Sequence, residues 1–101
     1  MSSVDPFGVQ AIQVTTDSLA VTGRFYLRQV CVVHKGTADV DIDIYDQLTA
    51  PSGGDVPHCQ IPALGKGVNT IPLPSPGMMF MTGAYVDLPS DTSIVLFVER
   101  V

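Results

Sequence analysis

Apolar and polar residues alternate along much of this chain with a period of two, which is the spacing of a β-strand that buries one face. The clearest run is ADVDIDIYD at 38–46, where three apolar residues alternate with three acids: Val40, Ile42 and Ile44 with Asp39, Asp41 and Asp43. No stretch keeps a helical period for three turns, and Pro and Gly interrupt the chain every several residues. The pattern therefore predicts strands and turns rather than helices.

Turn residues divide the chain into candidate strands at 9–14, 25–34, 40–46, 58–61, 68–73, 78–81, 85–88 and 93–100. The segment 25–34 is apolar on both faces around 30–33, as in a strand at the centre of a sheet, whereas Pro72 indicates that 68–73 is an edge strand or an irregular strand. Seven or eight short strands with turns about ten residues apart are typical of an antiparallel β-sandwich or a jelly roll. We therefore predict an all-β fold, with residues 9–101 as a single sandwich domain and residues 1–8 as an N-terminal arm.

The composition fits one folded domain with a poorly charged surface. Of 101 residues, 46% are hydrophobic and only 15% are charged, against about a quarter in an ordinary globular chain. Such a surface suits a protein that packs against neighbours. The net charge is −5, and the five Lys and Arg residues are scattered, so no basic stripe is available for nucleic acid or for an anionic membrane.

Two further features of the sequence indicate in which compartment the protein is expected. The apolar runs are far too short to span a bilayer, and the start MSSVDPFG has neither the basic residue nor the apolar stretch of a signal peptide. Without export, Cys31 and Cys59 are expected to stay reduced in a cytosol, although a bridge between them remains open at this point.

The acidic run at 38–46 has two interpretations. Side chains two residues apart emerge about 6.6 Å apart on one face of a strand, so one Ca²⁺ could bridge two neighbouring aspartates and would still lack most of its oxygen ligands. A calcium loop also needs Gly at its sixth position and Glu at its twelfth, where this chain has Ile44 and Ala50. Burying each apolar partner contributes about 1.5–3 kcal/mol, which exceeds a repulsion of roughly 0.6 kcal/mol between hydrated carboxylates. We therefore interpret Asp39, Asp41 and Asp43 as a solvated face, with a cation shared with another subunit as the alternative.

Four residues are of the types that bind zinc: Cys31, His34, His58 and Cys59. Their spacing argues against a metal site. On a strand, residues three apart or adjacent point to opposite faces, and zinc knuckles place their close pairs on turns. We interpret these residues as core cysteines beside rim histidines.

Catalytic motifs are not evident. The chain has no G-x-S-x-G elbow and no phosphate-binding loop, and the Gly-Lys-Gly at 65–67 is expected to be a turn. Glu99 is the only glutamate, and Tyr26, Tyr45 and Tyr85 form no evident platform for a sugar. The apolar segment 78–81 (MMFM) is interpreted as a core strand, with a Met-rich edge that serves as a contact surface as the alternative. We expect no catalytic, cofactor or metal site, and no enzyme.

The segments after residue 23 follow one another in a characteristic order. A strand ends at Tyr45-Asp46 and is followed by the turn TAPSGG at 49–54. The segments VNTIPL (68–73), MMFMTGAYVDL (78–88) and SIVLFVERV (93–101) follow, with the spacing Phe-x-x-Gly-x-Tyr in the second. In this order the chain resembles small virion proteins of tailed bacteriophages. The resemblance covers residues 23–101 and carries no functional residues over.

This resemblance implies a structural role in the virion, assembled in the host cytoplasm. The expected function is that of a capsid decoration or cement protein, which binds the major capsid protein and stabilises the head shell as an oligomer such as a homotrimer. The alternatives are a tail or head–tail junction component and, in a different class, a β-sandwich module that binds a glycan or a receptor. Nucleic acid and membranes are not expected partners. Phe7 in the predicted arm is a candidate anchor on the shell.

Overall fold

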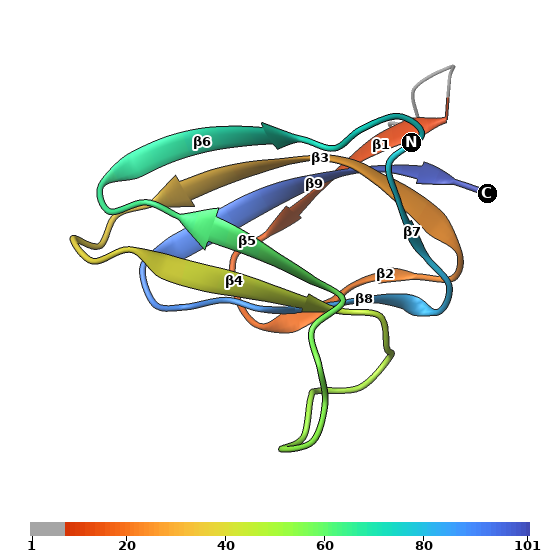
Figure 1. Ribbon diagram of the computed structural model, residues 1–101, viewed down its shortest axis with the longest axis horizontal. Coiled ribbons are helices and arrows are strands. Elements are labelled where there is room, and N and C mark those ends of the chain that lie inside the picture. Colours follow the sequence, from red (N-terminus) through yellow and green to blue (C-terminus); the bar gives the residue numbers. More distant parts are fainter. Residues whose placement is uncertain (1–7) are drawn as a thin grey trace.

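Two antiparallel sheets face each other across one apolar core in the computed structural model, which describes residues 8–101 (Figure 1). Sheet A contains, in spatial order, β1 (Val9–Val14), β9 (Thr92–Arg100), β3 (Phe25–His34) and β6 (Gly67–Pro72), and β7 (Met78–Phe80) also pairs with β3. Sheet B contains, in spatial order, β2 (Ser18–Thr22), β8 (Gly83–Asp87), β4 (Val40–Tyr45) and β5 (Cys59–Ala63). The radius of gyration is 13.1 Å, close to the value of about 13 Å for a compact domain of 100 residues.

The predicted all-β sandwich is therefore confirmed, with nine strands among residues 8–101 instead of seven or eight. The strand that the pattern did not predict is β2, whose five residues, SLAVT, are interrupted by a register shift between Leu19 and Val21. Val21 is buried while Leu19, two residues before it, is exposed, so the two large apolar residues of this short segment do not both reach the core. None of the described residues forms a helix long and apolar enough to cross a membrane.

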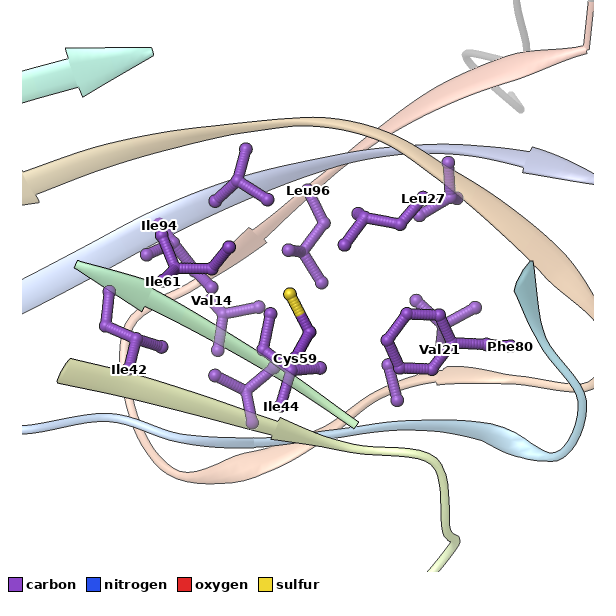
Figure 2. Packing of buried hydrophobic residues seen from close by; sticks show 14 of the residues in the cluster. Val14, Val21, Leu27, Ile42, Ile44, Cys59, Ile61, Phe80, Ile94 and Leu96 are labelled. Carbon is purple, nitrogen blue, oxygen red and sulfur yellow. The ribbon is translucent and has the colours of Figure 1, made fainter. Parts of the chain in front are cut away.

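The core forms because alternate residues of both sheets point inward. In β4, Ile42 and Ile44 have no exposed surface, as the period of two predicts. They face inward residues of sheet A, among them Ile94 and Leu96 of β9 (Figure 2). At the other end of the core, the rings of Phe25 and Phe80 stack with their centroids 4.8 Å apart.

Three predictions about strand position have different outcomes. β3 is central, between β9 and the pair β6 and β7, as predicted from its two apolar faces. β6 is an edge strand, as Pro72 indicated. The Met-rich segment 78–81 was interpreted as a core strand, but β7 pairs only with β3, and Met81 is 56% exposed while Phe80 is buried.

The predicted arm at residues 1–8 lies outside the described residues except for Gly8. The described chain enters sheet A directly, since β1 begins at Val9. The arm, with Phe7 as its anchor, therefore stays a prediction.

Candidate functional site

The acidic run lies along β4 with its carboxylates away from the core. Asp41 is exposed and Asp43 is half-buried on the outer face of sheet B, while the isoleucines between them are buried. Among residues 8–101, no group of three or more His, Cys, Asp or Glu side chains is arranged to hold a metal ion.

Two of these aspartates have structural partners. Asp39, just before β4, accepts a hydrogen bond from the backbone N–H of Gly65 (2.8 Å) and so fixes the turn between β5 and β6. A Cβ at Gly65 would lie 2.2 Å from the carbonyl oxygen of Thr37, so this close approach requires glycine. Asp43 accepts a hydrogen bond from the side chain of Gln60 on β5 (2.9 Å).

Asp43, Asp87 and Asp17 come together on the outer face of sheet B. Asp43 and Asp87 are directly opposite each other on β4 and β8. Asp17, in the turn before β2, accepts a hydrogen bond from the backbone N–H of Leu88 (2.7 Å). Burial raises the pKa of Asp87, and the negative charges of Asp17 and Asp43 raise it further. The three carboxylates repel one another. The sequence pattern had identified only one of them, Asp43.

Asp46 ties the end of β4 to the turn between β7 and β8. Its carboxylate accepts hydrogen bonds from the backbone N–H groups of Met81 (2.9 Å), Thr82 (2.8 Å) and Gly83 (3.2 Å). Burial opposes its ionisation, but these three donors, together with the charge of His58, outweigh that effect and lower the pKa of Asp46. The residue closes the turn between β7 and β8 and is a structural acceptor.

The four candidate zinc ligands are separated by the sandwich. Cys59 points into the core with its sulfur between the sheets (Figure 2), whereas Cys31 is half-buried on the outer face of sheet A. Both thiols are free. His58 is exposed, packs its edge on Phe80 with centroids 4.6 Å apart, and donates from Nε2 to the carbonyl of Met79 (2.8 Å). Cys59 therefore lies in the core and His58 at the rim, as predicted. The prediction is wrong for the other pair, because Cys31 lies on the outer face and His34 is buried.

His34 is buried at one end of the sandwich, beside a hollow of about 400 Å³ formed by the β3–β4 loop and the β8–β9 turn. Its Nε2–H donates to the carbonyl of Ala38 (2.8 Å), and its Nδ1 is hydrogen-bonded to the hydroxyl of Thr92 (2.9 Å). The hydroxyl oxygen of Thr92 is also 3.1 Å from the carbonyl oxygen of Ser90, and its single proton can be donated to either of these two acceptors. Both ring nitrogens are thus used within the protein, so His34 holds two loops together and offers no free nitrogen to a ligand in the hollow.

The three tyrosines do not share one surface. Tyr45 and Tyr85 are directly opposite each other in sheet B, and Tyr26 lies in sheet A. Tyr45 is buried, and its desolvation, followed by the charges of Asp43, Asp87 and Asp55, raises its pKa. This arrangement does not make the flat, exposed aromatic platform that sugar binding uses.

The outer face of sheet A contains a broad area without charge. Three consecutive cross-strand rows on this face contain only apolar and neutral polar residues: Val68, Val33 and Ser93; Thr70, Cys31, Val95 and Gln13; Pro72, Gln29, Phe97 and Ala11. We call these eleven residues the uncharged face. Charged residues lie at both ends of it: Glu99 forms an ion pair with Arg28 at one end, and Lys35 and Asp91 lie beside Val33 and Ser93 at the other. Val33 and Val68, which are opposite each other, are 36% and 69% exposed.

The two outer faces of the sandwich therefore differ. Sheet B carries carboxylates, and sheet A carries a continuous area of valine, phenylalanine and neutral polar side chains. The sequence contains a signal for this surface in β9, where Val95 and Phe97 alternate with the buried Ile94, Leu96 and Val98. A strand that is apolar on both faces indicates that something covers both of them.

No family model, no curated protein and no solved structure matches the chain. The fold and the surfaces described above are thus the basis for a functional hypothesis. The similarity to virion proteins of tailed phages stays a prediction from the order of its segments.

Proposed function

We propose that this protein is a structural virion protein that decorates the head shell of a tailed bacteriophage, and that it binds the shell through the uncharged face. The observation that carries the proposal is the contrast between the two sheets: three charge-free rows on sheet A and the aspartates of sheet B. The order of strands and turns after residue 23, which resembles small phage virion proteins, supports the virion setting.

The uncharged face has the properties of a protein-binding surface. Interface centres are depleted in charged residues, because each buried charge must lose its water. The apolar residues Val33, Val95 and Phe97 lie side by side in neighbouring rows on β3 and β9, so a flat partner could cover them together. The acidic face of sheet B would then remain in solvent, where its repulsion keeps decorated particles apart.

The proposed mechanism is mechanical. A decoration protein that contacts two adjacent shell subunits buries surface on each, so that expansion or rupture of the shell must also break those contacts. Stable protein interfaces bury about 1,200–2,000 Å² in total, and several copies held together add avidity. A role in the tail or at the head–tail junction would use the same kind of surface, and the copy number per particle separates the two locations.

The test compares two variants that each add one negative charge. Val33→Asp places the charge in the uncharged face, and Thr22→Asp places it at an exposed position of β2 on sheet B. Each is added to purified shells that lack the protein, and occupancy is measured by co-sedimentation. We expect Val33→Asp to lose at least roughly tenfold in occupancy, because the contact would have to remove water from the added charge, and Thr22→Asp to bind like the wild type.

Circular dichroism and thermal melting verify that both variants are folded. Equal occupancy of the two variants, or no binding of the wild-type protein, would contradict the proposal. In particles purified from infected cells, a copy number close to that of the main shell subunit indicates decoration, and the few copies of a single ring indicate the tail or the head–tail junction.

A further inference from the structure

We infer that β1 is a self-association strand: it pairs antiparallel with β1 of a second copy, so that the two A sheets become one continuous sheet. β1 is an edge strand, hydrogen-bonded only to β9 in sheet A. Its six residues, VQAIQV, pair with β9 in an unbroken register from Val9 to Val14. The strand contains no charge, no proline and no glycine.

The other edge strands each contain a feature that opposes pairing with a further chain. β2 has a register shift after Leu19, and β5 contains Pro62, which has no N–H to donate. β6 begins with Gly67 and ends with Pro72, and β7 has only three residues. β1 alone among the edge strands of the described residues has none of these protections.

Within the part of the chain that the structure describes, the outer edge of β1 presents backbone groups without partners. Apart from the ladder with β9, no backbone hydrogen bond among residues 8–101 involves the residues of this strand. An edge of this kind is a template for a further strand. A second β1 fits it well, because a two-fold axis between identical strands satisfies both edges with the same set of donors and acceptors.

The directions of the side chains limit the register to two choices. Residues opposite each other in antiparallel strands point to the same face, and in β1 Val9, Ala11 and Gln13 point outward while Val14 points into the core. A register centred on the strand therefore places Ala11 opposite Ala11 of the second copy, or Ala11 opposite Gln13 of the second copy.

Electrostatics favours β1 as the contact. Each copy carries a net charge of −5, so association is easiest where no charge of one copy meets a like charge of the other. Among the described carboxylates, Glu99 lies opposite Val9 on β9 but is paired with Arg28, and Asp17 lies beyond the end of the strand in the turn to β2. At physiological salt, charges more than about 8 Å apart are largely screened.

Pairing through β1 has a geometric consequence. A two-fold axis perpendicular to the sheet keeps outer faces on the same side, so the two uncharged faces would form one surface, with both acidic faces on the opposite side. The inference does not depend on the proposed shell binding, but it would double the surface available for it.

The first experiment measures self-association of the purified full chain, without shells, by sedimentation velocity from the low micromolar to the submillimolar range. The wild-type protein is expected to show a concentration-dependent dimer. Ala11→Lys places two lysines together at the pairing centre and should raise the dimer Kd at least roughly tenfold. The matched control Thr70→Lys adds the same charge to the same face of sheet A at the opposite edge, on β6, and should leave the Kd unchanged.

The second experiment identifies the register in a Cys31→Ser background. Opposite residues of paired strands have Cβ atoms close enough for a disulfide. Ala11→Cys should crosslink with itself in one register, and with Gln13→Cys in the other. A wild-type protein that stays monomeric throughout, equal effects of Ala11→Lys and Thr70→Lys, or no crosslink in either register would each overturn the inference. Dimerisation without shell binding would refute only the proposed function.

Discussion

The carboxylate of Asp46 accepts a hydrogen bond of 2.8 Å from the backbone N–H of Thr82, although 36 residues separate the two. The neighbouring N–H groups of Met81 and Gly83 bind the same carboxylate. The end of β4 is thereby tied to the turn that leads from sheet A back into sheet B. One side chain satisfies three backbone donors, so its loss leaves all three without their partner.

We expect Asp46→Ala to destabilise the protein by about 2 kcal/mol at pH 7, because hydrogen bonds to a charged group contribute about 1.5–3 kcal/mol and this site remains partly hydrated. Chemical denaturation measures the free energy of unfolding. Asp41→Asn is the control, since it removes a carboxylate from the exposed face of β4 and should change that free energy by about 0.5 kcal/mol or less.

The effect of Asp46 should depend on pH. Its pKa is lowered in the folded state, so it contributes stability above the ordinary pKa of an aspartate, and this contribution is lost as the pH falls through the lower folded value. The difference between wild type and Asp46→Ala should therefore shrink in acid. A difference that stays constant down to the lowest accessible pH would show that the effect is steric.

The local pattern of the sequence predicted much of the fold. The bounds of β1 and β3 were predicted to the residue, because each is a run of strand-forming residues between clear turns. The inward direction of Ile42 and Ile44 followed from a period of two. β2 was missed because it has only five residues and two large apolar side chains, of which Val21 is buried and Leu19 is exposed.

The surfaces could not be predicted in the same way, because they depend on which strands become neighbours. The uncharged face exists because β6, β3, β9 and β1 are adjacent in that order, although they are distant in the sequence. The contact of Asp43 with Asp87 and the three donors to Asp46 likewise arise from long-range pairing. A period of two indicates which side chains point outward but not which of them meet.

The repulsion around Asp87 predicts that removing this carboxylate stabilises the protein, whereas removing the carboxylate of Asp46 destabilises it. Asp87→Asn should stabilise the protein at pH 7 by about 0.5 kcal/mol, since it removes one of two like charges that face each other on neighbouring strands. Asp41→Asn, which removes a charge from the same sheet, is the control for the change in net charge.

The pH dependence of the Asp87→Asn effect follows from the raised pKa of Asp87. The ionised carboxylate costs stability above its folded pKa, and protonation removes this cost as the pH falls through that value. The stabilisation by Asp87→Asn should therefore disappear in acid, as measured by denaturation at several pH values. A destabilised variant at neutral pH would mean that hydrogen bonds of Asp87 outweigh its repulsion.

The buried contact of His34 with Thr92 predicts a structural role for both. Thr92→Val keeps the shape of the side chain but removes the hydroxyl that binds Nδ1 of His34 and the carbonyl of Ser90. Leaving buried polar groups without partners costs about 1–3 kcal/mol, and thermal and chemical denaturation should show this loss. The exposed Thr70→Val should have little effect, and equal stability of the two variants would contradict the role assigned to the hydroxyl.

The two thiols should differ in reactivity because they lie on opposite sides of sheet A. Cys59 is buried in the core, and burial raises its pKa, so at neutral pH it is both shielded and protonated. Cys31 is half-buried on the outer face and can be reached by solvent.

With a chromogenic disulfide reagent at pH 8, we expect one thiol per chain to react in the native protein and the second to react only on unfolding. Cys31→Ser should abolish the fast phase, and Cys59→Ser should abolish the slow one. Rapid reaction of the thiol that remains in Cys31→Ser would show that the core opens far more readily than the packing of Ile44, Ile61 and Leu96 implies.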